Sequence, residues 1–326
     1  MRYLKFILSG CLWLLALSQV QANGTDRPTV FVVVGAAGED VYGSQFVKWA
    51  GHWREAATKA GASFVAVGLD TDQNKDREDF QAKLTAERKE GAGELWLVLL
   101  GHGTFDGKEA KFNLRGTDFN AEELAEWLKP FQRPIAVINT SAASAPYLSK
   151  LSLSGRVVIA ATKSGYEVNY ARFGEYISKA IADKEADLDK DGQTSLLEAY
   201  LMASRQVAEY YETEGRIMTE HSLLDDNGDG LGTPADWFRG VRATKKASNN
   251  TELDGFRAHQ FHLVRSAEEQ KMPAELRVKR DELELSLNKL REKKSSMKGV
   301  DYDKELETLL LQLARVYEKA GLLKQE

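Results

Sequence analysis

The chain has 326 residues, of which 43% are hydrophobic, and a formal net charge of −5. A chain of this length can bury a sizeable core, and its mildly acidic balance disfavours binding to nucleic acid or to an anionic membrane surface. Its single cysteine, Cys11, lies in the leader described next, so the remaining chain has no disulfide and no thiol nucleophile.

Residues 1–22 have the three parts of a secretory signal. Basic Arg2 and Lys5 precede an apolar stretch, and Val20-Gln21-Ala22 forms a small-x-small cleavage site. The apolar stretch is shorter than the roughly 20 residues that a membrane-spanning helix needs, so no transmembrane segment is predicted. We expect a periplasmic or secreted protein that is cleaved after Ala22. A lipoprotein anchor through Cys11 is the weaker alternative, because apolar residues continue beyond it.

Residues 23–182 alternate apolar runs with segments of helical spacing. Continuous apolar runs are typical of strands that are covered on both faces, and the alternation indicates a mainly parallel, doubly wound sheet of the α/β class. Asn120 and Glu123 form a predicted capping box. The predicted strands are 30–34, 64–67, 95–100, 135–138 and 157–160, and the predicted helices are 45–59, 80–90 and 120–128.

Two of the predicted strands end in polar motifs. The third strand runs into Gly101-His102-Gly103, and the fourth ends at Asn139-Thr140-Ser141. A further loop, Ala161-Thr162-Lys163-Ser164-Gly165, follows the fifth strand. Because the carboxyl ends of parallel strands meet at one edge, where ligands bind, we expect these loops to lie together.

The three strand-end loops resemble those of the legumain/caspase-like clan of cysteine peptidases, over about residues 29–182. The resemblance implies a caspase-like fold, with His102 as general acid/base and Ser141 at the position of the nucleophilic cysteine. The family's Ser-Gly after the nucleophile is replaced by Ala143-Ser144-Ala145. A serine hydroxyl does not ionise as readily as a thiol and needs an oriented base in contact with it. We therefore predict a pseudopeptidase.

A cleft without catalysis could still bind a peptide or protein. The predicted peptide-binding residues are Gly103, Asn139, Asn169 and Arg172. Arg172 could bind a carboxylate with two hydrogen bonds, or it could be a surface arginine that opens the next helix. A serine hydrolase using Ser141 and His102 stays open as an alternative, with Asp106 or Asp118 as the group that orients the histidine.

Residues 183–243 are more acidic, and they contain a loop with EF-hand spacing. Oxygen-bearing side chains stand at positions 1, 3, 5, 9 and 12 with glycine at position 6, and position 7 offers its backbone carbonyl. A solvated acidic loop is the alternative. The predicted Ca²⁺ ligands are Asp187, Asp189, Asp191, Gln193, Ser195 and Glu198.

A second acidic loop begins 38 residues after the first, and a predicted helix over 196–211 lies between them. This arrangement resembles a pair of EF-hands. Pro234 does not suit a helix that leaves the second loop, so the ligand at position 12 is its least regular part. The predicted ligands are Asp225, Asn227, Asp229 and Asp236.

The last part of the chain is predicted as a linker, residues 244–272, and a coiled-coil-like helical hairpin, residues 273–326. Leu276, Leu283 and Leu290 are seven residues apart, and the pattern resumes over 306–316 after a break. Such a narrow apolar stripe indicates packing against the main domain or self-association. His259-x-x-His262 is half of a zinc motif that nothing in the sequence completes.

The sequence therefore predicts an exported, calcium-binding pseudopeptidase that binds a peptide or protein. Two alternatives remain open: a serine-dependent peptidase, and a structural protein that oligomerises through its C-terminal hairpin.

Overall fold

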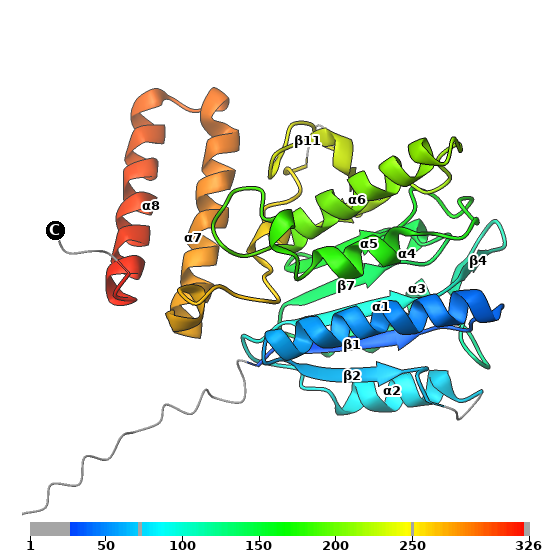
Figure 1. The fold of residues 1–326 in the computed structure, drawn as a ribbon. Helices are drawn as coiled ribbons and strands as arrows, with labels where there is room; N and C mark the ends of the chain where they lie inside the picture. Colours follow the sequence, from blue (N-terminus) through cyan, green and yellow to red (C-terminus); the bar gives the residue numbers. More distant parts are fainter. Residues whose placement is uncertain (1–26, 71–73, 249–250, 323–326) are drawn as a thin grey trace, which may run out of the picture.

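The computed structural model describes residues 27–70, 74–248 and 251–322, so the predicted leader lies outside the described residues. Its centre is a seven-stranded sheet in the order β10-β9-β8-β7-β3-β1-β2 (Figure 1). Five of these strands are parallel, which confirms the predicted mainly parallel α/β architecture. They are β1 (Thr29–Val34), β2 (Ser63–Val67), β3 (Leu95–Leu100), β7 (Ile135–Asn139) and β8 (Arg156–Ala160).

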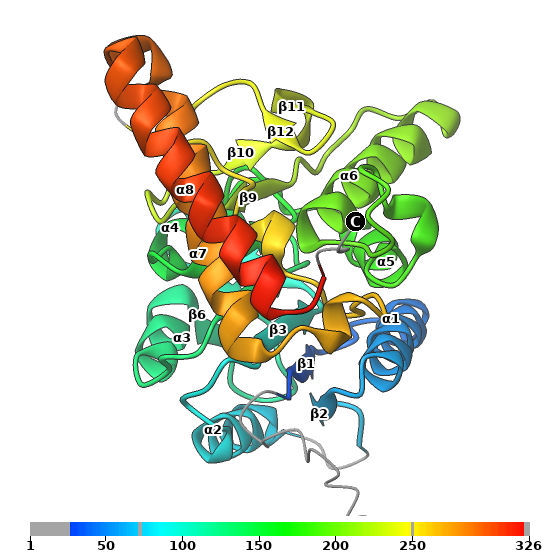
Figure 2. The same ribbon diagram turned by 90° about the vertical axis from the view of Figure 1, so that its left-hand side faces the viewer.

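Helices cover both faces of the sheet (Figure 2). Side chains alternate along a strand, so Val32 packs into the core beneath one helical layer and Val33 into the core beneath the other. The first layer contains α1 (Asp40–Lys59), α5 (Phe173–Ala180) and α6 (Leu196–Thr213), and the second contains α2 (Asp76–Ala86), α3 (Ala121–Leu128) and α4 (Ala145–Leu151).

Local sequence signals located α1, α2, α3 and α6 with small shifts, whereas no bounds were predicted for α4 and α5. Helix α1 begins five residues earlier than predicted, and α2 is displaced toward the N-terminus by about one turn. The predicted capping box of α3 is confirmed, since Asn120 and Glu123 exchange side chain-to-backbone hydrogen bonds.

The segment predicted as a separate calcium-binding unit contributes to the main sheet. Strand β9 (Leu223–Asp225) pairs antiparallel with β8, and β10 (Thr233–Pro234) pairs antiparallel with β9. Leu224 is fully buried in the core, which explains why this stretch joins the sheet. The boundary predicted at residue 183 is therefore wrong, and the second acidic loop joins two strands and not two helices.

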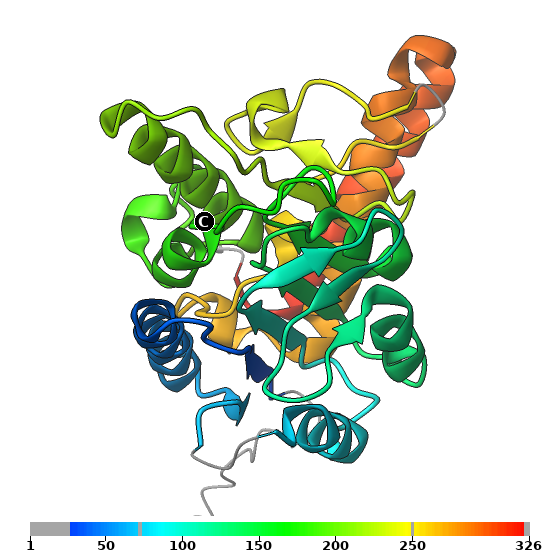
Figure 3. The same cartoon turned by 90° about the vertical axis from the view of Figure 1, so that its right-hand side faces the viewer.

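Short elements complete the body. A three-stranded sheet of β4 (Gly103–Phe105), β5 (Ala110–Phe112) and β6 (Phe119–Asn120) stands at the carboxyl edge of the parallel strands (Figure 3). The others are β11 (Phe238–Arg239), β12 (Arg242–Ala243) and the 3-10 helices Lys184–Ala186, Ala235–Trp237, Ala258–Gln260, Glu269–Lys271 and Lys294–Ser296.

The predicted linker over 244–272 is wrong for most of its length. Ala258, Phe261 and Leu263 are buried in the main core, so this stretch packs against the body. It leads into α7 (Ala274–Lys293) and α8 (Gly299–Lys319), which run side by side in opposite directions and share a small core (Figure 1). Among the described helices, none has the length and apolar character needed to cross a membrane.

Candidate functional site

The three strand-end loops meet at the carboxyl edge of the sheet. A Cβ added to Gly103 would lie 2.9 Å from Ser141 Oγ and 2.2 Å from the Ala142 carbonyl oxygen, so only glycine allows this approach. The Ala143 N–H donates a 2.8 Å hydrogen bond to the Glu167 carbonyl, which brings in the loop after β8. The residues predicted to form the cleft therefore share one region.

His102 is held by aromatic rings and by one carbonyl. Its ring centroid lies 5.1 Å from Tyr42, 5.2 Å from Phe46 and 5.9 Å from Tyr170. Its Nε2 lies 3.1 Å from the Ala37 carbonyl oxygen. A carbonyl can only accept, so Nε2 carries the proton and Nδ1 is the basic nitrogen of the neutral ring.

The orienting group is thus a backbone carbonyl, which sequence reasoning missed. The two carboxylates considered for this role are engaged elsewhere: Asp106 accepts the Glu109 N–H, and Asp118 accepts the Leu114 N–H. A backbone carbonyl leaves no residue-type signal in a sequence.

Ser141 is buried and hydrogen-bonded within its own loop. Its side chain is 1% exposed, and its hydroxyl donates a 2.7 Å bond to Asn139 Oδ1. In the described part of the chain no hydrogen bond joins Ser141 to His102, so no base contacts the hydroxyl. Asn139 Nδ2 is buried without a partner among the described residues, which leaves one donor in this loop.

The two remaining predicted peptide-binding residues lie in the loop after β8. Asn169 is exposed. Arg172 is the N-cap of α5, which matches the alternative that it opens the next helix. Its guanidinium carbon lies 4.0 Å from the Tyr210 ring centroid, a cation–π contact. The most exposed large side chain of this loop is Tyr166, 75% exposed and packed edge-on against Phe105.

The first acidic loop has an ordered backbone. The Asp187 carboxylate accepts the N–H groups of Lys190 at 2.7 Å and Gly192 at 3.1 Å, and Asp189 and Asp191 each accept the N–H two residues ahead. Lys190 and Gly192 have positive φ, as this tight turn requires. The carboxylates of Asp187, Asp189 and Asp191 lie within 4.8 Å of one another.

Ser195 and Glu198 connect this loop to α6. They form the capping box of α6, and Glu198 also accepts the N–H groups of Leu188 and Asp189. Glu198 lies in a second cluster with Asp189 and His259, whose Nε2 is 3.0 Å from Asp189. His259, from the segment predicted as a linker, is a member of this site that the loop spacing did not indicate.

The second acidic loop repeats the turn of the first. The Asp225 carboxylate accepts the N–H groups of Gly228 and Gly230, both at 3.0 Å. Asn227 and Asp229 each accept the N–H two residues ahead. The equivalent bonds occur at the same positions in both loops, although one lies before a helix and the other between strands.

No hydrogen bond among the described residues joins the ligand predicted at position 12, Asp236, to the second acidic loop. Asp236 is exposed and lines an apolar cavity beside α6. Its place is taken by Asp254, which is 2% exposed and accepts the N–H groups of Asp226 and Asn227 and the Thr233 hydroxyl. Pro234 and β10 turn the chain away from the helical path that would direct Asp236 back to the loop.

Three buried carboxylates, those of Asp225, Asp226 and Asp254, meet at this second loop. Burial raises the pKa of Asp225 and of Asp226, while burial and the neighbouring Asp226 raise the pKa of Asp254 to about 8. No lysine, arginine or histidine in the described ranges forms an ion pair with them. Oxygen donors with uncompensated negative charge fit a hard divalent cation such as Ca²⁺.

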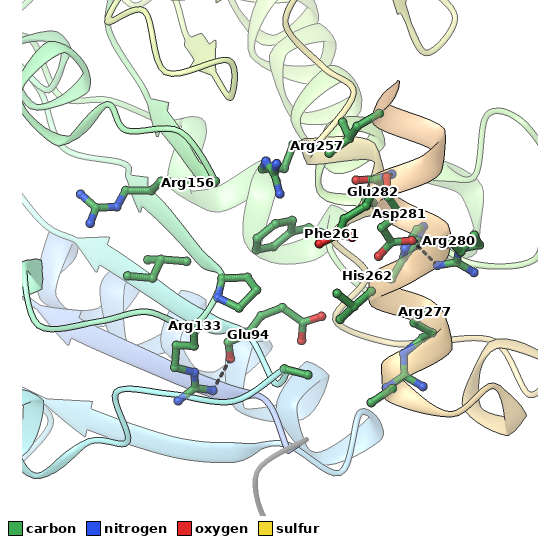
Figure 4. Close-up of a pocket in the computed structure, with 18 of the residues that line it drawn as sticks. Glu94, Arg133, Arg156, Arg257, Phe261, His262, Arg277, Arg280, Asp281 and Glu282 are labelled. Atoms are coloured by element: carbon green, nitrogen blue, oxygen red, sulfur yellow. Dashed lines mark hydrogen bonds and ion pairs between the residues drawn. The ribbon is translucent and has the colours of Figure 1, made fainter. Parts of the chain in front are cut away.

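A polar cavity of about 400 Å³ lies at the opposite edge of the sheet, against α7 (Figure 4). Its charged groups are largely matched: Arg280 pairs with Glu269 and Asp281, and Arg133 donates to the Glu94 carbonyl. We interpret this region as the interface that holds α7 against the end of the main sheet.

The comparisons with known proteins concern the fold alone. No family model matches the chain, and no curated protein matches it in sequence. The Drosophila initiator caspase Dronc is 13% identical over 64% of this chain and 82% of its own, with a TM-score of 0.44. Caspase-1 from Spodoptera frugiperda is 9% identical over 62% of this chain and 87% of its own, with a TM-score of 0.40. Both similarities are distant, and the sheet described above stands on its own contacts.

Proposed function

We propose that this chain is an exported, calcium-binding pseudopeptidase whose His102–Ser141 cleft binds a peptide or protein without cleaving it. One observation carries the assignment of a non-catalytic site: residue Ser141 is 1% exposed and its hydroxyl is bonded to Asn139, while His102 Nε2 is bonded to the Ala37 carbonyl. Serine catalysis needs the hydroxyl in contact with the base and open to a substrate carbonyl.

An aromatic pair near these loops supports the binding of an extended peptide, because its Tyr166 ring is 75% exposed. Tyr166 and Phe105 form an edge-to-face pair at the rim, where they can cover an apolar side chain.

The calcium part of the proposal assigns one ion to each acidic loop. Asp187, Asp189, Asp191 and Glu198, with the Gln193 carbonyl and Ser195, would serve the first site. Asp225, Asn227 and Asp229, with Asp254 in place of Asp236, would serve the second. The ions would offset the buried negative charge. Asp254 and His259 come from one short segment, so calcium would tie that segment to the body.

Cleavage by the purified protein tests the cleft assignment. The protein and its Ser141→Ala variant are incubated with a mixed peptide library in millimolar calcium, and products are read by mass spectrometry. We expect no cleavage that depends on Ser141. Cleavage that disappears in the variant would establish the serine hydrolase and overturn the proposal.

Peptide binding is tested in the same library by retention on the immobilised protein. Tyr166→Ala should lower the retained amount at least several-fold, because it removes the exposed ring at the rim. Ile217→Ala is the matched control, since Ile217 is also an exposed apolar side chain, 89% exposed, but lies outside the cleft loops. Equal retention by both variants would argue against a cleft-bound peptide.

A second candidate function is self-association through the C-terminal hairpin. Leu310 and Leu311 on α8 are 47% and 53% exposed, on the helix that is outermost in Figure 1. An apolar pair on an exposed helix favours contact with another helix. A second copy of the chain is the occupant that we propose for this face.

A further inference from the structure

An apolar cavity of about 600 Å³ lies alongside α6, and neither His102 nor Ser141 lines it. One wall comes from the segment around the first acidic loop and another from residues 234–240. A cavity of this size is in the range that accommodates small ligands or several side chains. The apolar residues that line it include Phe173, Leu201, Met202, Val207, Met218 and Phe238.

Several of these side chains are only partly covered by the protein. Leu201, Met202, Met218 and Phe238 pack against the main core yet remain half-buried. Methionine is flexible and polarizable, so Met202 and Met218 can adapt to ligands of different shape. Leu188 of the first acidic loop adds a 48% exposed apolar side chain to the same lining.

The unmatched charge around the cavity is negative. The basic side chains of the lining already have carboxylate partners, because Arg205 pairs with Glu209 and the His221 ring contacts Glu167 through Nδ1.

Two carboxylates at the cavity, those of Glu185 and Asp236, are exposed and have no ion-pair partner in the part of the chain that the structure describes. A third, Glu220, is buried and accepts the N–H groups that open α5. A ligand that adds positive charge beside Glu185 and Asp236 would complement this rim.

We infer that the cavity beside α6 is a second binding site, for a peptide segment that combines large apolar side chains with lysine or arginine. The apolar side chains fill the space between Met202, Met218 and Phe238. The cationic side chain pairs with Glu185 and Asp236 at the rim. The lining shares Ala161 with the loop after β8, but neither His102 nor Ser141 contributes to it.

Calorimetric titration of the full chain with two blocked pentapeptides tests the inference. Lys-Leu-Phe-Leu-Lys should bind at least tenfold more tightly than Glu-Leu-Phe-Leu-Glu, because only the first complements the rim. Met218→Glu should lower the affinity for the basic peptide at least tenfold, since it places a charge in the apolar lining. Ile217→Glu is the matched control: the neighbouring side chain is 89% exposed, does not line the cavity, and should leave binding unchanged.

A surface variant keeps the test decisive if Met218→Glu does not fold. The double variant Glu185→Lys with Asp236→Lys changes two exposed residues and should reverse the preference between the two peptides. Tyr166→Ala in the cleft should leave binding unaffected. Three outcomes would each overturn the assignment. They are equal affinity for both peptides, an equal loss of affinity in Met218→Glu and Ile217→Glu, and a loss of affinity in Tyr166→Ala.

Discussion

Asp254 occupies in the second acidic loop the position that Glu198 occupies in the first. Each carboxylate accepts the N–H groups of loop positions 2 and 3, and each accepts the hydroxyl of position 9. Glu198 follows the first residue of its loop by 11 residues, whereas Asp254 follows Asp225 by 29. Two loops with the same turn are therefore closed by carboxylates that reach them along different paths.

This equivalence predicts which carboxylate the second calcium site requires. We expect two sites in a calorimetric calcium titration, and Asp254→Asn should weaken one of them at least tenfold, or about 1.4 kcal/mol. Asp236→Asn should leave both sites intact, because Asp236 is exposed at the cavity beside α6. If Asp236→Asn weakened one site and Asp254→Asn weakened neither, Asp236 at loop position 12 would be the ligand.

The contact between Gly103 and the Ser141 loop predicts a large cost for a single methyl group. Gly103→Ala would place a Cβ 2.2 Å from the Ala142 carbonyl oxygen, so we expect a loss of about 1–3 kcal/mol in the free energy of unfolding. Gly51→Ala is the control: Gly51 lies within α1 with nothing within 4 Å of an added Cβ. It should stabilise by about 0.5–1 kcal/mol. Chemical denaturation midpoints measure both, and equal values would contradict the contact.

His262 predicts a loss of stability at mildly acidic pH. Burial and the neighbouring His259 lower the pKa of His262 from 6.5 to about 4. As pH falls through this interval the unfolded state takes up the proton first, so the folded state loses stability between pH 6.5 and 4. The loss approaches about 3 kcal/mol at 1.36 kcal/mol per pH unit.

A non-titrating variant isolates this contribution. In His262→Gln the free energy of unfolding should decline less steeply over the same interval. Denaturant titrations at pH 7, 5.5 and 4 would measure the difference. Parallel declines in the two proteins would show that another group controls the acid sensitivity.

The exposed pair on α8 predicts the route of self-association. Leu310→Asp with Leu311→Asp should reduce the dimer fraction at least tenfold in sedimentation analysis, because it places two charges on the proposed contact. Ile217→Asp changes a still more exposed apolar residue away from the hairpin and should leave the dimer unchanged. A sedimentation profile that does not respond to the double variant would exclude this face as the contact.

Local patterns predicted much of the fold. The continuous apolar runs of β1 and β3 need cover on both faces, and this identified the parallel sheet before any contact was known. The paired bonds of Asn120 and Glu123 span three residues, so their spacing alone predicts the start of α3. Both acidic turns are likewise made by bonds between residues at most five apart, and six-residue motifs specify them.

Such local patterns do not predict contacts between segments that are distant in the sequence. Two adjacent leucines, Leu223 and Leu224, do not predict a strand by themselves. They belong to the main sheet only because they pair with β8. Phe261 and Leu263 belong to a stretch with a polar, linker-like composition, and their burial depends on the core that other elements form.

The sequence by itself determined the parallel sheet, the capped start of α3 and the two acidic turns, because each depends on residues close in the chain or on a periodic pattern. Only the tertiary structure decided that the Ala37 carbonyl contacts His102, that Ser141 is buried against Asn139, and that Asp254 accepts hydrogen bonds from the second acidic loop. These outcomes depend on where separate segments come to lie, and a carbonyl or a remote carboxylate gives no local signal of its partner. Interactions between residues close in the sequence can be predicted from it, whereas interactions between distant segments are known only from the folded structure.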